Sequence, residues 1–109
     1  MPNKNYIKGR NYEYKTKFIL ESWNYYVVRS AGSHSKIDLV AFLKLTSDNF
    51  DRLPIIRAIQ VKADSSPIKK DLQEIQRLQL PAIVCKEIWH WRKQEKLPKI
   101  IEVSSEGAL

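Results

Sequence analysis

The sequence lacks long apolar runs, paired cysteines and low-complexity segments. No apolar stretch approaches the roughly 20 residues that span a membrane, so we expect no transmembrane segment. The first fifteen residues have no apolar region of the kind that a secretory signal needs. Cys85 stands alone and excludes an internal disulfide, and with His34 and His90 it gives no zinc-ligand spacing. These absences together predict a cytoplasmic protein.

Positive charge is what the sequence has in excess. Its 109 residues include 19 Lys and Arg against 12 Asp and Glu, which gives a formal net charge of +7. With 43% hydrophobic and 28% charged residues, the composition is that of a folded domain rather than a disordered chain. A chain of this length supports one domain with one core. A small basic domain suits a polyanionic partner such as a nucleic acid.

Hydrophobic periodicity divides the chain into two helices and five strands. The helical period predicts a first helix over 11–23, and a second from 65–67 to about Leu80, where Pro81 stops it. Runs of β-branched and aromatic residues predict strands at 25–29, 37–45, 55–63, 82–85 (which 88–91 continues or follows) and 100–103. This order predicts an α/β fold with a mixed sheet.

The first predicted helix carries two apolar faces. The larger face consists of Tyr12, Thr16, Ile19, Leu20 and Trp23. Tyr14 and Phe18 lie on the opposite side, four residues apart. A helix that packs on a sheet needs one apolar face, so this second pair is either half-exposed or part of a partner surface. For Trp89 and Trp91, which alternate on a strand, core or dimer packing is favoured over base stacking.

A polar cluster is predicted where two strands meet. Strand alternation places Gln60 and Lys62 on the same face of the strand over 55–63. If that strand and the one over 37–45 form a hairpin, facing residue numbers sum to roughly 99, which sets Asp38 opposite Val61 or Lys62. Glu13, at the edge of the first helix, completes the cluster if that helix packs over this end of the sheet.

Such a cluster suits metal-assisted hydrolysis of a phosphodiester. Mg²⁺ prefers hard oxygen ligands in octahedral geometry. Asp38 supplies an anionic oxygen, and the side-chain carbonyl of Gln60 and the backbone carbonyl of Val61 supply neutral ones. The metal would activate a bound water and offset charge on the phosphate, while Lys62 would orient that water and stabilise the transition state.

Three segments together resemble the PD-(D/E)XK nuclease superfamily. They are Gly9-Arg10 with Glu13, the run over 27–33 (VVRSAGS) followed by 37–40 (IDLV), and 60–62 (QVK). Within the superfamily the chain is most similar to the archaeal Holliday junction resolvases and their viral relatives. The resemblance covers about residues 7–65, and the remaining elements fit it in order only. It implies a restriction-endonuclease-like α/β/α core around a mixed five-stranded sheet, as a single domain over 1–109.

The resemblance implies a homodimeric, Mg²⁺-dependent endonuclease that cuts four-way DNA junctions, with Mn²⁺ as a substitute metal. DNA is then the partner, and neither a membrane nor a small-molecule substrate is expected. Such an enzyme would act in an archaeal or bacterial cell, or for a virus in an infected cell. By motif position the metal ligands are Glu13, Asp38, Gln60 and the backbone of Val61, and the other catalytic residues are Lys62 and Ser30. The expected DNA contacts are Arg10, Lys15, Arg29, Ser33, Lys69 and Lys70.

One residue departs from the family pattern. Gln60 stands where the family usually has Glu, and a neutral amide ligates a cation only through its oxygen. Two alternatives therefore stay open beside the junction resolvase. The chain is either another endonuclease of the superfamily, acting on flaps, single strands or duplex DNA, or a DNA-junction-binding protein with a weak catalytic site.

Overall fold

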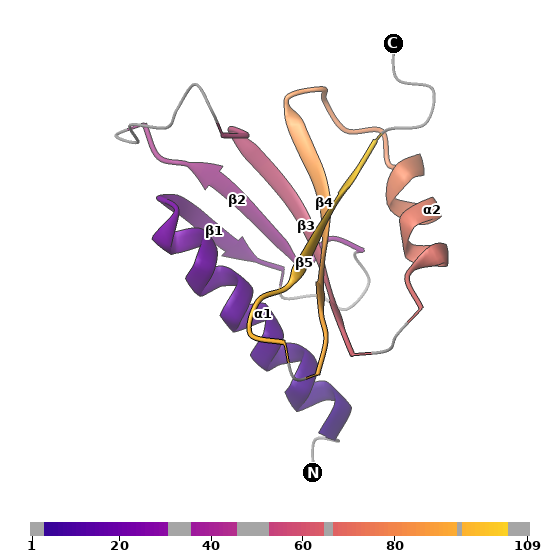
Figure 1. Cartoon of the computed structure of the whole chain (residues 1–109). Coiled ribbons are helices and arrows are strands. Elements are labelled where there is room, and N and C mark those ends of the chain that lie inside the picture. The colour runs from indigo at the N-terminus through magenta and orange to yellow at the C-terminus, as the bar shows by residue number, and fades with distance from the viewer. Residues whose placement is uncertain (1–3, 31–35, 46–52, 65–66, 94, 105–109) are drawn as a thin grey trace.

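The computed structural model describes residues 4–30, 36–45, 53–64, 67–93 and 95–104, and it contains two helices and one sheet (Figure 1). The elements follow one another as α1 (Lys4–Ser22), β1 (Tyr25–Arg29), β2 (Leu39–Leu43), β3 (Ile56–Ala63), α2 (Lys69–Arg77), β4 (Val84–Trp91) and β5 (Lys99–Val103). Neither helix of this described part is long and apolar enough to cross a membrane. The predicted order of elements is confirmed.

The sheet is mixed, as predicted, with its strands in the order β1-β2-β3-β4-β5. β1, β2 and β3 pair antiparallel, β4 pairs parallel to β3 across α2, and β5 returns antiparallel to β4. The β2–β3 register pairs Leu39 with Ile59, so facing numbers sum to 39 + 59 = 98 rather than 99. The expected alignment of Asp38 is therefore wrong by one residue, and this register brings Asp38 level with Gln60.

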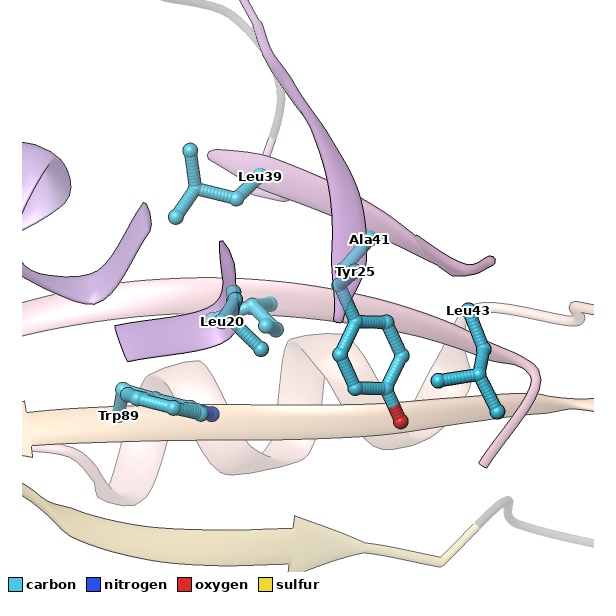
Figure 2. Packing of buried hydrophobic residues seen from close by; sticks show 7 residues of the cluster. Leu20, Tyr25, Leu39, Ala41, Leu43 and Trp89 are labelled. Carbon is cyan, nitrogen blue, oxygen red and sulfur yellow. The ribbon is translucent and has the colours of Figure 1, made fainter. Parts of the chain in front are cut away.

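The sheet buries two separate apolar clusters, one on each face. α1 contacts β1, β2 and β3, and its Leu20 packs with Tyr25, Leu39 and Trp89 (Figure 2). The second cluster, on the α2 side, consists of Ile75, Ile88 and Val103, with Leu72 and Ile101 packed against it. Because adjacent residues of a strand point to opposite faces, Trp89 and Ile88 belong to different clusters. The two helices therefore lie on opposite sides of the sheet (Figure 1).

The helices differ from their predicted bounds at both ends: α1 ends at Ser22 rather than residue 23, and α2 begins at Lys69 rather than at 65–67. α1 begins at Lys4 rather than Asn11, because a helix tolerates Gly9 at a cost of about 1 kcal/mol. α2 ends at Arg77 rather than near Leu80. There the buried ammonium of Lys86 donates hydrogen bonds to the carbonyl oxygens of Ile75, Gln76 and Leu78, at 2.8, 3.2 and 2.9 Å. The last carbonyls of a helix lack intrahelical partners, so this lysine satisfies them from β4.

A buried ion pair joins β3 to β4 near the first residues of β3. Arg57 Nη1 donates to Glu87 Oε2 at 2.7 Å, and Arg57 Nε donates to Tyr25 Oη at 3.0 Å. Trp89 Nε1 donates to the other oxygen of Glu87 at 3.0 Å. Each charged group thus has several partners, which a buried ion pair needs to offset its loss of hydration. Sequence reasoning did not identify this network.

Candidate active site

Asp38 lies where the β2–β3 ladder ends, one residue before β2. Its backbone N–H donates to the carbonyl of Ile59 at 2.8 Å, and its own carbonyl accepts from the N–H of Ser30 at 2.8 Å. The side chain turns to β3, where Oδ2 accepts from the N–H of Val61 at 2.8 Å. The carboxylate thus replaces a ladder partner for Val61, and its position is fixed by three strand segments.

Burial sets the protonation of this carboxyl group. Desolvation, with a smaller effect from the nearby charge of Glu13, raises the pKa of Asp38 to about 6. The Val61 N–H and the positive charges of Lys62 and Arg29 oppose the shift without cancelling it. Asp38 and Glu13 therefore lie near each other in a site where burial disfavours the ionised form of Asp38. A cation bound between them would favour the ionised form of Asp38.

Glu13 reaches the edge of this site from α1, where Arg29 of β1 holds it. Arg29 Nε donates to Glu13 Oε1 at 2.9 Å, and both side chains are partly exposed. The Arg29 guanidinium also lies 5.2 Å from the ring centroid of Tyr14. The expected packing of α1 over this end of the sheet is thus observed. Arg29 is therefore placed to orient Glu13.

Gln60 and Lys62 share one face of β3, as predicted, and both reach the same carboxylate. Gln60 Nε2 lies 3.2 Å from Asp71 Oδ1, and Lys62 Nζ lies 3.2 Å from Asp71 Oδ2. The Gln60 oxygen, Oε1, is buried without a hydrogen-bond partner in the described ranges. Asp71 comes from the first turn of α2 and was not predicted. Its spacing of four from buried Ile75 is the signal that places it on the inward face of the helix.

Besides Arg29, which contacts Glu13, the expected DNA contacts are two pairs of helix residues and Ser33. Arg10 and Lys15 are exposed on α1, and Lys69 and Lys70 are exposed at the start of α2. Ser33, with His34, lies outside the described residues. Arg10 lies one helical turn before Glu13 on α1, Lys15 lies over Tyr12 and Trp91, and Lys69 and Lys70 directly precede Asp71 on α2.

A groove of about 720 Å³ runs beside α1, next to the site. It is lined by Tyr14, Lys15, Phe18, Ile19, Trp91, Glu95, Lys96 and Leu97. The ammonium of Lys15 lies 5.3 Å from the ring centroid of Tyr12 and 5.8 Å from that of Trp91. The groove thus combines aromatic surface with positive charge.

The donor set fits Mg²⁺ better than a softer metal. Among the residues that the structure describes, no three of the His, Cys, Asp and Glu side chains gather into a metal-binding group. The ligands would be oxygens of Asp38, Glu13 and Gln60, with the Val61 carbonyl, which points to the same side of β3 as its N–H. Hard oxygen donors of mixed charge suit Mg²⁺ or Mn²⁺. The unpartnered Gln60 oxygen is the feature that a cation would satisfy.

Comparisons with known proteins assign no family to the chain. No family model matches it, and neither does any curated protein or solved structure. What the structure establishes is an α/β domain with two helices and a mixed five-stranded sheet. Its function is inferred from the residues of the site.

The raised pKa of Asp38 predicts a pH-dependent cost to stability in metal-free protein. The unfolded-state pKa is near 3.8 and the folded-state pKa is about 6, so folding stability falls as pH rises through this window. In EDTA, Asp38→Asn should raise the free energy of unfolding by about 1–2 kcal/mol at pH 8 and should remove most of the loss between pH 4.5 and 8. Urea unfolding at both pH values measures this.

Glu21→Gln is the control for that experiment, because Glu21 is an exposed carboxylate on α1. It should leave the loss of stability between the two pH values unchanged. If Asp38→Asn loses as much stability as wild type between pH 4.5 and 8, ionisation of Asp38 is not the cause of that loss.

Proposed function

We propose that the chain is a metal-dependent endonuclease that hydrolyses DNA phosphodiester bonds, with the restriction-endonuclease-like α/β/α core of the PD-(D/E)XK superfamily. The observation that carries the proposal is the meeting of Asp38, Gln60 and Lys62 at the junction of β2 and β3, with Glu13 at its edge. The order of the elements supports it, because the helices and strands follow the order that the motifs imply. Such an enzyme would meet its DNA in the cytoplasm.

The residues of the chain divide the chemistry between them. Asp38, Glu13, Gln60 and the Val61 carbonyl would hold Mg²⁺, which supplies Lewis-acid activation of water and neutralises phosphate charge. The Lys62 ammonium, held by Asp71 at 3.2 Å, would donate hydrogen bonds to the attacking water or to the phosphate as its charge grows. Ser30 follows β1 directly, and with Arg29 it would contact the scissile phosphate.

Positive charge on both helices would bind the DNA backbone. Arg10 and Lys15 on α1 and Lys69 and Lys70 on α2 are exposed. Contacts of this kind position DNA without reading its sequence, and they weaken as salt rises. The groove beside α1 adds aromatic surface to this path, which suits an unpaired or branched segment.

We propose further that the enzyme is a homodimer that cuts four-way junctions, and that its dimer surface is the face of β1 and β2 turned away from α1. Tyr26, Val28 and Phe42 are exposed there by 63%, 45% and 42%, and Val40 lies between them. None of these side chains is charged, so contact between two copies on this face sets no like charges of these strands against each other. The groove beside α1 carries Lys15 and Lys96 against one acidic residue, Glu95, and with its aromatic side chains it suits DNA instead.

Burial separates the earlier candidates for the interface. Trp89 and Trp91 are exposed by 0% and 3%, so they belong to the core rather than to a contact between copies. Tyr14 and Phe18 are exposed, but they line the groove beside α1. The neutral side chain of Gln60 supports a second candidate function, binding of DNA junctions with little cleavage.

The nuclease proposal predicts Mg²⁺-dependent cleavage of a synthetic four-way junction. Asp38→Asn and Lys62→Ala should each lower the cleavage rate at least about 100-fold, because they remove a metal ligand and a group that stabilises the transition state. Lys99→Ala is the control, since Lys99 is an exposed lysine on β5. Flap and linear duplex substrates at equal concentration identify the preferred DNA. Junction binding by wild type with no cleavage in Mg²⁺ or Mn²⁺ would favour the binding protein instead.

The dimer proposal predicts how single charges affect assembly. Wild type should sediment as a dimer at micromolar concentration, and Tyr26→Asp should sediment as a monomer with unchanged circular dichroism, because it buries a charge in an apolar contact. Phe18→Asp places the same charge in the groove beside α1 and should remain a dimer. Dissociation by Phe18→Asp but not by Tyr26→Asp would move the interface to the groove.

A further inference from the structure

Gln60 is held in one orientation by a group outside the nuclease motif. Its side chain is exposed by 7%, and its amide nitrogen lies 3.2 Å from Asp71 Oδ1. An ionised carboxylate only accepts hydrogen bonds, so the part of the amide that faces Asp71 must be the NH₂ group. The amide oxygen then points away from Asp71, and it has no hydrogen-bond partner in the described part of the chain.

Asp71 also holds the lysine of the motif. Its second oxygen lies 3.2 Å from Lys62 Nζ, and the carboxylate is itself nearly buried, with 10% of its side chain exposed. The other charged groups facing it are Lys36, with Nζ 3.8 Å from Asp71 Oδ1, and Glu74, which binds that lysine at 2.7 Å. One carboxylate of α2 therefore orients both motif side chains of β3, the amide through one oxygen and the ammonium through the other.

This arrangement explains why the strand carries Gln where the family usually has Glu. A carboxylate at position 60 would lie about 3 Å from the carboxylate of Asp71 in a nearly buried site, where like charges repel strongly. An amide at position 60 replaces that repulsion with a hydrogen bond. The negative charge that the strand lacks stands on α2 instead.

We propose that Asp71 is a positioning residue of the active site, and that Gln60 and Asp71 act as a pair that replaces the usual strand glutamate. Asp71 fixes the Gln60 oxygen toward the metal position and fixes Lys62 beside it. The catalytic meaning of the pair rests on the proposed nuclease function. The pairing itself does not, because it is a contact of the folded protein without metal.

A double-mutant cycle tests the pair in EDTA. Gln60→Glu alone and Asp71→Asn alone should each lower the thermal midpoint, by about 5 °C or more, because the first creates repulsion and the second removes the partner of Lys62. The double variant should recover most of the loss of Gln60→Glu, because the amide introduced at 71 donates to the carboxylate introduced at 60. Additive losses would overturn the pairing.

The matched control uses Glu74, which also carries negative charge on α2 but has no contact with Gln60 among the described interactions. Glu74→Gln combined with Gln60→Glu should give additive losses. If Glu74→Gln restores the thermal midpoint of Gln60→Glu as strongly as Asp71→Asn does, removal of any negative charge from α2 relieves the repulsion. That result would overturn a specific pair of Gln60 and Asp71.

Metal titration separates positioning from structure alone. By calorimetry with Mg²⁺, the double variant should bind at least tenfold more tightly than wild type, because it adds a carboxylate to the ligand set, while Asp71→Asn should bind more weakly than wild type. If the variants show additive losses of thermal midpoint in EDTA while wild type cleaves DNA, the pairing is overturned and the nuclease function is not. Absence of both metal binding and cleavage in wild type would overturn the function, and the positioning role with it.

Discussion

The alternation of side chains along β3 determines what each face of the sheet carries. β3 pairs with β2 on one side and β4 on the other, so it cannot turn without breaking both ladders. Its odd-numbered residues, Ile59 and Val61, pack with the cluster under α1. Its even-numbered residues, Gln60 and Lys62, face α2 and meet Asp71. The core under α1 and the side chains of Gln60 and Lys62 therefore use opposite faces of one strand.

The sequence predicted those parts of the site that depend on local period, and it missed those that depend on packing between elements. Alternation was enough to place Gln60 and Lys62 together. The β2–β3 register was off by one residue, because spacing along a chain does not fix the geometry of the connecting loop. Asp71 was missed because the rotation of α2 against the sheet is set by burial of Ile75 and Ile88, which lie far apart in sequence.

Charge is distributed so that each surface suits a different contact. The ion pair of Arg57 and Glu87 stays inside, at the end of β3 away from the site, where it joins β3 to β4. Basic side chains of both helices are exposed, while the outer face of β1 and β2 is apolar and uncharged. A net charge of +7 opposes association of two copies, and an uncharged face adds least to that repulsion.

We propose that the junction of β2 and β3 binds a divalent cation through Asp38. Isothermal titration of the metal-free protein with Mg²⁺ tests it most directly, because it requires neither DNA nor turnover. The account predicts one main binding event per chain in wild type and its loss in Asp38→Asn, which should fold at least as stably. Equal Mg²⁺ binding by wild type and Asp38→Asn, or none by wild type, would contradict it.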